Sequence, residues 1–335
     1  MARNATGPRP LSNRHPGFIR RHKTGQPKFY GLATILLTIA LLFGVAPGKV
    51  TRWLQTRFNP PSAGLATATV PALTGQLEVH FLDVGQADCI LVIQGADAML
   101  IDAGNNDDAE HIISYLKEQG VSELDYLVAT HPHEDHIGSV DDVARNFAID
   151  KVLMPDLVSK YKTYEDAMQV IKEQALPIIH PNFSQTFQLG QASFQILSQP
   201  ALTYDTWNSA SLILMITFGQ NKFLMTADTE VRSEELLLAT NFNIKADVLK
   251  VAHHGSDSST SVDFLDAVQP SAAVIQVGLG NPYGYPVADV LNDLDQAGID
   301  IYRTDLAGDI VATSDGTTVT FDTQPDKGLP GQIPA

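Results

Sequence analysis

The stretch "ATHPHEDHIGS", residues 129–139, places three histidines, a glutamate and an aspartate within reach of one another. The chain has only 10 histidines in all, so this is a marked local concentration. A polar surface turn would explain the stretch as simply as a metal site would. In the order H-x-H-x-D-H, however, imidazole and carboxylate groups match the ligands that Zn²⁺, Mn²⁺ and Fe²⁺ prefer, and they leave positions open for water. The rest of the sequence decides between the two interpretations.

Polar clusters follow apolar, strand-like runs at four places in the chain. The run "LDYLVAT" (124–130) ends directly before His131, and the other clusters are "DAG" (102–104), "TAD" (226–228) and "HHGS" (253–256). Strand ends that gather at one rim of a sheet are where ligand sites are commonly built. This placement favours the metal site.

The histidine motif divides into two ligand sets. Residues two apart on a turn can converge, so we expect His131 and His133 in one set and Asp135 and His136 in the other. Two ions about 4 Å apart need a bridging carboxylate, and Asp228 at the end of "KFLMTAD" is the candidate. An aspartate there could also cap the helix that follows. Its position directly after an apolar strand favours the bridging role.

One member of the pair His253–His254 is expected to complete the second set. Neighbouring side chains on extended backbone point in opposite directions, so we expect one ligand and one group that faces substrate. We assign His254 to the metal, and we assign His253 and Asp135 to catalysis. A water bound at such a centre is acidified towards neutrality and supplies a hydroxide nucleophile.

The N-terminal part of the 335-residue chain predicts a membrane anchor. Residues 1–28 form a basic tail with seven Lys or Arg and no acidic residue, and residues 29–46 carry no charge at all. An apolar run of this length is just long enough to span a bilayer as a transmembrane helix. The preceding basic residues predict a single-pass protein in the cell membrane, with a cytoplasmic N-terminus and an extracellular catalytic domain. Cleavage after Ala46 would instead leave the body secreted.

The remaining chain divides into a linker, one body and a short tail. Residues 47–75 are rich in Pro, Gly, Ala, Ser and Thr and read as a linker, and residues 324–335 read as a loose C-terminal tail. Between them, over 76–323, Val-, Ile- and Leu-rich runs alternate with helical stretches such as 107–120 and 164–175. This alternation predicts an α/β fold of two sheets covered by helices on the outside.

Composition limits the classes of partner. The chain has 38 acidic and 22 basic residues, and the tail alone holds seven of the basic ones, so 15 basic residues oppose 38 acidic ones in the rest. Such a body repels phosphate backbones, which disfavours nucleic acid as a partner although a bound cation could reverse the sign locally. The single cysteine, Cys89, excludes an intrachain disulfide and a cysteine zinc site. Nothing in the sequence points to a protein partner.

With these residues in place, the chain resembles the metallo-β-lactamase fold superfamily of metal-dependent hydrolases. More narrowly, it is similar to the hydrolase domain of the ComEC/Rec2 competence proteins and their stand-alone secreted relatives. The resemblance covers the body, 76–323, and rests on "FLDVGQADCILV", "LIDAG", "THPHEDHIGS", "LKVAHHGSDSSTS" and "RTDLAGDI". It implies an αββα four-layer sandwich with one or two divalent ions, Zn²⁺ or Mn²⁺, on the rim that the two sheets share. It also implies that Asp102 orients the ligand loop rather than binding metal.

The chain departs from the pattern of this superfamily at three positions. The superfamily often has a further metal-binding histidine in a segment that here reads "WNSASLIL" and offers Asn208 instead. The branch commonly has Gly where Ala87 stands and His where Tyr285 stands. Asn208 and Tyr285 are therefore expected to contact substrate, and occupancy by one or by two ions stays open.

The function predicted from these features is that of an extracytoplasmic phosphodiesterase that uses a metal-bound hydroxide. In "HHGSDSSTS", His253 and Ser256 offer hydrogen-bond donors where phosphate oxygens could lie, and an exported or wall-associated phosphodiester would suit the location. Two alternatives remain. One is a competence-related DNA nuclease of the ComEC/Rec2 type, and the other is a metal-stabilised binding protein without turnover.

Overall fold

The computed structural model describes residues 73–199 and 205–324. The predicted basic tail (1–28), transmembrane anchor (29–46), nearly all of the linker and residues 325–335 of the C-terminal tail lie outside this range. None of the helices within the described ranges has the length and hydrophobicity that a bilayer crossing requires.

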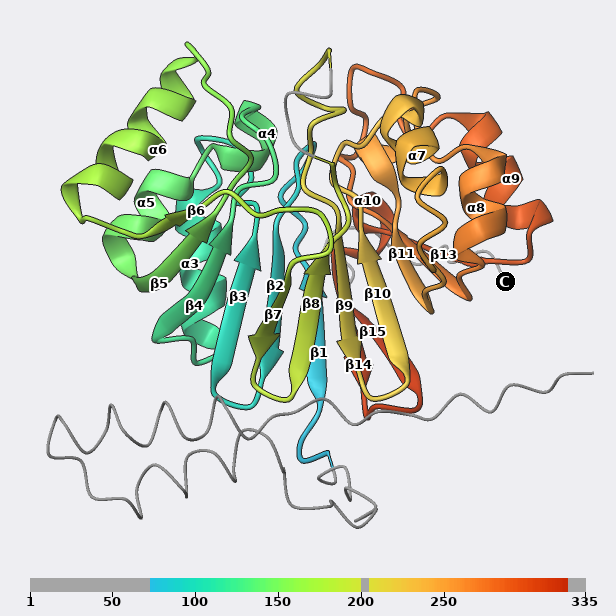
Figure 1. The fold of residues 1–335 in the computed structure, drawn as a ribbon, viewed down its shortest axis with the longest axis horizontal. Helices are drawn as coiled ribbons and strands as arrows, with labels where there is room; N and C mark the ends of the chain where they lie inside the picture. The colour runs from blue at the N-terminus through green and yellow to red at the C-terminus, as the bar shows by residue number, and fades with distance from the viewer. Residues whose placement is uncertain (1–72, 200–204, 325–335) are drawn as a thin grey trace, which may run out of the picture. The chain divides into compact units, whose positions relative to one another are not determined.

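The body contains two β-sheets that face each other (Figure 1). The first sheet has the strand order β15-β14-β1-β2-β3-β4-β5-β6, and its pairings are antiparallel from β15 to β3 and parallel from β3 to β6. Its strands are β1 (Leu77–Phe81), β2 (Ile90–Gln94), β3 (Asp97–Ile101), β4 (Glu123–Val128), β5 (Ala148–Leu153), β6 (Ile178–Ile179), β14 (Asp309–Ser314) and β15 (Val319–Gln324).

The second sheet has the order β13-β12-β11-β10-β9-β8-β7, parallel from β13 to β10 and antiparallel from β10 to β7. Its strands are β7 (Thr186–Leu189), β8 (Ala192–Ile196), β9 (Leu214–Phe218), β10 (Asn221–Met225), β11 (Val248–Lys250), β12 (Ala272–Ile275) and β13 (Asp300–Arg303). Side chains from both sheets, among them Phe81, Phe194 and Phe223, form one buried cluster between them. This cluster joins the two sheets into a sandwich.

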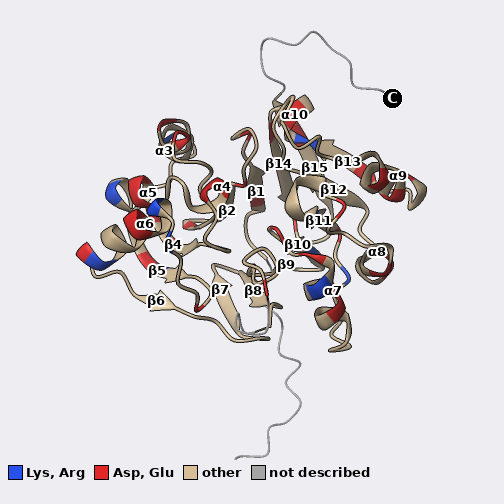
Figure 2. Ribbon diagram, turned by 90° about the horizontal axis from the view of Figure 1, so that it is seen from above, with Lys and Arg blue, Asp and Glu red and all other residues tan. Residues whose placement is uncertain are grey.

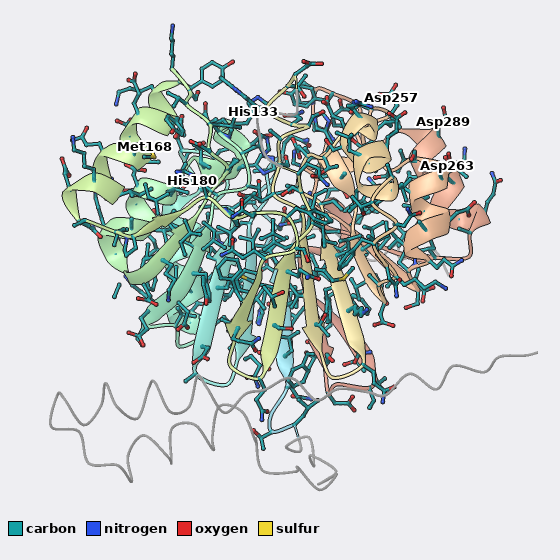
Figure 3. The ribbon with its side chains drawn as sticks, in the orientation of Figure 1. His133, Met168, His180, Asp257, Asp263 and Asp289 are labelled. Atoms are coloured by element: carbon teal, nitrogen blue, oxygen red, sulfur yellow. The ribbon has the colours of Figure 1, made fainter. Side chains whose placement is uncertain are left out.

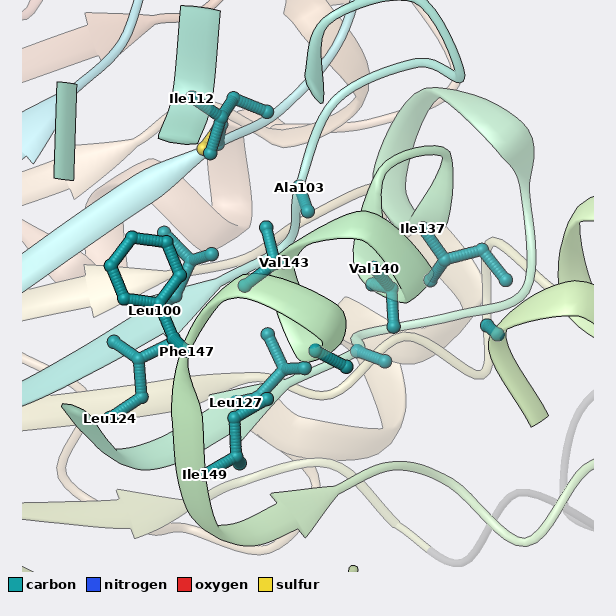
Figure 4. Packing of buried hydrophobic residues seen from close by; sticks show 14 of the residues in the cluster. Leu100, Ala103, Ile112, Leu124, Leu127, Ile137, Val140, Val143, Phe147 and Ile149 are labelled. Atoms are coloured by element: carbon teal, nitrogen blue, oxygen red, sulfur yellow. The ribbon is translucent and has the colours of Figure 1, made fainter. Parts of the chain in front are cut away.

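Helices cover the outer faces of both sheets (Figure 1). Helices α3, α5 and α6 pack on the first sheet, where Ile112, Val143 and Leu127 belong to one apolar cluster (Figure 4). Helices α7, α8 and α9 pack on the second sheet through another. The helices are α3 (Ala109–Glu118), α4 (Glu134–Ile137), α5 (Val140–Asn146), α6 (Lys162–Glu173), α7 (Val231–Leu238), α8 (Val262–Val268), α9 (Ala288–Gln296) and α10 (Thr304–Ala307), with a 3₁₀ turn η2 (Ala252–Gly255). The two-sheet α/β sandwich predicted from the sequence is confirmed.

The parallel strands bring the four polar clusters together. Strand β3 ends just before Asp102 and the neighbouring β4 just before the histidine motif, while β10 and the neighbouring β11 end just before Asp228 and His253. Because the carboxyl ends of parallel neighbours meet at the same edge, all four clusters lie on one rim of the sandwich. In Figure 3, His133 lies at this rim, between the two layers of helices.

Candidate metal centre

A cavity of about 760 Å³ opens on the rim, and side chains that follow strands of both sheets line it. His133 and Asp135 come from the loop and helix after β4, Asp228 follows β10, and His253 and His254 follow β11. The sequence pattern that predicted a shared rim therefore corresponds to one concave site.

The first group of side chains is His131, His133 and Asp228. Nε2 of His131 lies 2.9 Å from Nδ1 of His133 and 3.8 Å from Oδ2 of Asp228. One ligand atom from each side chain lies within 4.8 Å of the others. Two imidazoles and one carboxylate oxygen at this spacing can share a single divalent ion.

The second group is Asp135, His136, Asp228 and His254. Nε2 of His254 lies 3.4 Å from Oδ2 of Asp135 and 3.9 Å from Oδ1 of Asp228. Nε2 of His136 lies 3.2 Å from the same Oδ1. This group offers four ligand atoms, and all of its residues except Asp135 are buried.

Asp228 belongs to both groups and turns a different oxygen towards each. The side chain is 1% exposed, and its Oδ1 and Nε2 of His136 lie 3.2 Å apart, but neither atom makes a hydrogen bond of good geometry within the described residues. Buried polar atoms without partners are costly unless something else satisfies them. A divalent ion would satisfy both atoms, so the residues present fit a metal with Asp228 as the bridging ligand.

The electrostatics of the second group also favour a bound cation. Burial alone would lower the pKa of His136, but the carboxylates of Asp228, Asp102 and Asp135 outweigh it and raise the pKa well above its usual value. In the first group, burial lowers the pKa of His131, which keeps that imidazole neutral and ready to bind metal. The site as a whole therefore attracts positive charge.

Asp102 makes the contacts of an orienting residue. Its Oδ1 accepts a hydrogen bond from the Thr130 amide at 2.8 Å, and its Oδ2 accepts one from the Thr130 hydroxyl at 2.7 Å. The same Oδ2 lies 2.8 Å from Nδ1 of His136. Because these contacts occupy both oxygens, Asp102 fixes the ring of His136 with Nε2 towards Asp228. This geometry agrees with the role that the family resemblance implies.

The backbone at His253 and His254 differs from the expectation. The sequence interpretation assumed extended backbone, but both residues have left-handed φ values of 49° and 54° within η2. The turn buries His254, whose Nδ1 lies 2.9 Å from the carbonyl oxygen of Gln276, and directs its Nε2 towards Asp135. His253 stays partly exposed, with Nδ1 3.0 Å from the Ser258 hydroxyl. The two rings still point to different partners, but the left-handed turn causes this.

The predicted substrate residues are placed unequally. Asn208 and Tyr285 line the cavity, and Nδ2 of Asn208 lies 3.3 Å from Nε2 of His253. Ser256 is buried and is not among the lining residues, and its hydroxyl lies 3.1 Å from that of Ser258. Ser256 therefore organises the loop in this structure and does not face the cavity. The helix-capping alternative for Asp228 is wrong, because α7 begins at Val231 and Glu230, not Asp228, occupies its N-cap position.

Sequence reasoning missed the buried ion pair between Lys250 and Asp88. Lys250 is 0% exposed, and Asp88 Oδ1 lies 3.5 Å from Nδ1 of His254. The other oxygen of Asp88 lies 3.9 Å from Nδ1 of His136, so the pair lies behind both histidines of the second group. Gln276 adds to this support by donating to the carbonyl oxygens of Leu82 and Cys89 at 3.0 and 2.8 Å.

The two-sheet α/β sandwich and the adjacent histidine–aspartate groups on its rim together indicate a class of metal-binding proteins. The model of the metallo-beta-lactamase superfamily matches residues 82–278. The chain belongs to this superfamily of metal-dependent hydrolases, whose members bind one or two divalent ions.

Similar proteins support the narrower resemblance. ComE operon protein 3 of Bacillus subtilis is 31% identical over 76% of this chain and 35% of its own length. Recombination protein 2 of Haemophilus influenzae is 28% identical over 70% of this chain and 28% of its own length. The chain thus spans about a third of each relative, and the predicted resemblance to competence proteins is confirmed. A solved metallo-beta-lactamase fold protein, YhfI of Bacillus subtilis, has a TM-score of 0.50 at 12% identity, with 74% of this chain and all of that chain covered, which shows the fold alone.

Proposed function

We propose that this protein is a metal-dependent phosphodiesterase. The observation that carries the proposal is Asp228, one carboxylate shared by two ligand groups that open into a single cavity. Divalent ions held by these residues would supply Lewis acidity and a source of hydroxide at neutral pH, which suits displacement at phosphorus.

Three side chains around the centre have the chemistry to hold a phosphodiester. His253 lines the cavity, and its Nε2 lies 3.8 Å from Oδ2 of Asp228, close enough to both ligand groups to contact a phosphate oxygen. The Ser258 hydroxyl fixes the other ring nitrogen, so the ring presents one defined edge to substrate. Asn208 and Tyr285 line the same cavity and can donate hydrogen bonds to the remaining phosphate oxygens.

The location and the natural substrate are part of the same proposal. The basic residues 1–28 and the uncharged run 29–46 support a signal anchor that holds the catalytic body outside the cell membrane. An exported or wall-associated phosphodiester would then be the substrate. Attachment of a reporter to the C-terminus, with protease added to intact cells, distinguishes an outside from an inside location.

Turnover of bis(p-nitrophenyl) phosphate by the full chain tests the activity. The protein is stripped of metal and then resupplied with Mn²⁺ or Zn²⁺, and we expect activity only after resupply. The Asp135→Ala variant should remain inactive, while Asp263→Asn, a change at an exposed position of α8, should leave the rate unchanged. Folded, metal-loaded protein without turnover would count against a phosphodiesterase and would favour a binding protein.

A DNA nuclease is the second candidate, and the similarity to ComE operon protein 3 and Recombination protein 2 favours it. The acidic excess of the chain opposes it, although in Figure 2 α5 and α6 carry red and blue segments together and α9 carries red alone. Incubation of metal-loaded protein with single-stranded and double-stranded DNA tests this candidate directly. Cleavage at a rate above that for small diesters would favour the nuclease.

A further inference from the structure

Aromatic side chains form a wall on one side of the metal groups. Tyr161, just before α6, lines the cavity and is 55% exposed. Its ring meets that of Trp207 edge to face, with centroids 5.0 Å apart, and the Trp207 ring lies 5.6 Å from that of His133. This wall therefore begins at a predicted ligand of the first group and continues outward to the surface.

A second aromatic wall begins at His253. The ring of Tyr285 lies 5.7 Å from that of His253, and Tyr283 stacks on Tyr285 with centroids 5.6 Å apart and planes 18° apart. Tyr283 is 66% exposed, and both tyrosines line the cavity. The metal groups thus lie between two aromatic walls carried by different loops: Tyr161 precedes α6 and Trp207 lies between β8 and β9, whereas Tyr283 and Tyr285 lie between β12 and α9.

Exposed aromatic rings at the mouth of a cavity favour ligands that can cover them. Large aromatic side chains are usually buried, and each gains free energy when a ring or apolar face packs against it. Here the exposed rings flank the place where a phosphate would bind. The groups esterified to that phosphate are the parts of a diester that would reach the two walls.

The charges that line the cavity oppose a second phosphate on the α5–α6 side. Four carboxylates line this side, and among the described residues that line the cavity Lys162 is the one Lys or Arg. Lys162 is already paired with Asp166 on α6. The four carboxylates are Glu134, Asp141, Asp142 and Asp166. Arg145 pairs with Asp141 and Asp142, and Lys162 with Asp166, so two cations stand against four carboxylates. A polyanion that continued along this side would therefore meet a net negative charge.

We propose that the cavity binds a short phosphodiester whose two esterifying groups each present a ring, one to Tyr161, which packs against Trp207, and the other to Tyr283 and Tyr285. A further phosphate on the α5–α6 side weakens binding. This inference rests on the proposed phosphodiesterase function and names the class of substrate that the site takes.

Two diesters that release the same leaving group, but differ in whether the other ester group carries a ring, test the inference. The metal-loaded full chain is assayed with thymidine 5′-(p-nitrophenyl phosphate) and with ethyl p-nitrophenyl phosphate, which release the same nitrophenolate from a primary alkyl ester. We expect kcat/KM for the thymidine diester to exceed that for the ethyl diester by about tenfold, because each stacked ring stabilises the complex. Adding a 3′-phosphate to the thymidine diester should lower kcat/KM.

Substitutions at the walls assign the preference to named residues. Because the nitrophenyl ring is common to both substrates, we expect the ratio of the two kcat/KM values to fall towards one in whichever of Tyr283→Ala and Tyr161→Ala removes the wall that holds thymine. In the other variant both kcat/KM values should fall together. Leucine at the thymine wall keeps apolar area without a ring and should give an intermediate ratio. Val158→Ala, at an 82% exposed position that does not line the cavity, should keep the wild-type ratio. Circular dichroism confirms folding of each variant, and truncation of such exposed side chains is well tolerated.

The outcomes separate this inference from the function on which it rests. Turnover of both diesters at similar rates, or a ratio that the tyrosine substitutions leave unchanged, would overturn the ring preference and leave the phosphodiesterase in place. Faster turnover after addition of the 3′-phosphate would overturn the exclusion of a second phosphate. No turnover of any diester by metal-loaded protein would overturn both proposals.

Discussion

The two ligand groups of the metal centre share Asp228 but differ in how the fold supports them. The first group offers His131, His133 and the shared carboxylate, and His133 is only partly buried. The second offers four ligands, and its histidines, His136 and His254, are 0% and 2% exposed. Each group thus has one partly buried member, His133 in the first and Asp135 in the second, and the two groups differ in the number of ligands that they offer, three against four.

The difference originates in the partners of the imidazoles. In the second group, the ring of His136 meets the carboxylate of Asp102, which raises the basicity of the ligand and fixes its orientation. In the first group, Nδ1 of His131 faces two hydroxyls, those of Thr130 at 3.2 Å and Ser211 at 3.3 Å. A neutral hydroxyl supports a ligand less strongly than a carboxylate does. We therefore expect the second group to bind its ion more tightly than the first.

Loss of the shared carboxylate should have the largest effect. Asp228→Ala removes one ligand from each group, so we expect both ions to be lost and turnover to fall by about 10⁴-fold. Metal content by inductively coupled plasma mass spectrometry and the diesterase assay measure the two effects. Asp263→Asn serves as the control for a surface aspartate. An Asp228→Ala protein that still held two ions would show that the groups are independent.

Loss of the buried Lys250–Asp88 pair should lower the free energy of unfolding more than loss of an exposed ion pair on α5. Lys250→Met leaves Asp88 as a buried charge without its partner, and such losses destabilise proteins by about 3–5 kcal/mol. The double variant Lys250→Met, Asp88→Asn should recover most of this. Arg145→Ala breaks the exposed pair with Asp141 on α5 and should cost at most about 1 kcal/mol. Urea unfolding of the metal-free proteins compares the three, and equal losses at Lys250 and Arg145 would contradict the account.

Replacing one histidine of each group by alanine tests directly which group binds its ion more tightly. We expect His254→Ala to weaken the tighter ion by at least about 10²-fold, since one of four ligands is lost. His133→Ala should instead abolish binding of the weaker ion and leave one tight ion per chain. Isothermal titration with Mn²⁺ distinguishes the two variants. The opposite pattern would place the tighter ion in the first group.

A histidine at position 208 should reduce the difference in metal affinity between the two groups. Asn208 lines the cavity near His253, and the superfamily often has a metal-binding histidine in this segment. Asn208→His is expected to raise the affinity for the weaker ion by about tenfold, an effect like that of other changes in metal-site support. Asn208→Gln, which keeps the amide, controls for the change in size. Unchanged affinity in Asn208→His would mean that the first group is limited by something other than a missing imidazole.

The smallest expected effect is on protein stability, through Glu234, which holds the loop that carries His253 and His254. Glu234 on α7 accepts hydrogen bonds from the amides of Thr260 and Ser261, and burial raises its pKa above the usual 4.5. Because the folded state favours protonated Glu234, its contribution to stability is present at low pH. This contribution is lost as the pH rises from 4.5 through the pKa of the folded state.

The difference in unfolding free energy between wild type and Glu234→Gln isolates this titration from that of other groups. In metal-free protein, the wild type should lose stability relative to the variant as the pH rises through that window. A difference that does not depend on pH would contradict the assignment.

Much of this site could be predicted from the sequence because its residues follow directly on strands. His131, His133, Asp135, His136 and Asp228 lie where strand ends and motif spacing indicated. The alternation of apolar runs and helical stretches predicted two sheets covered by helices, and the family resemblance implied the αββα order of the layers.

The parts that could not be predicted depend on contacts distant in the chain. Lys250 ends the strand "ADVLK", where a lysine normally reaches solvent, and it is buried only because the loop that carries Asp88 packs against it. The left-handed turn at His253 has no signal in "VAHHGS" beyond Gly255. Helices α5 and α8 have seven residues each, too short for a clear helical period.

The central claim is that Asp228 joins two metal groups into one centre, and electron paramagnetic resonance of Mn²⁺-loaded protein tests it most directly. The account predicts an isolated Mn²⁺ signal at one equivalent and an exchange-coupled pair at two. It predicts further that Asp228→Ala abolishes the coupled spectrum. Two equivalents that bind without coupling, or a coupled pair that survives in Asp228→Ala, would contradict a centre bridged by this carboxylate.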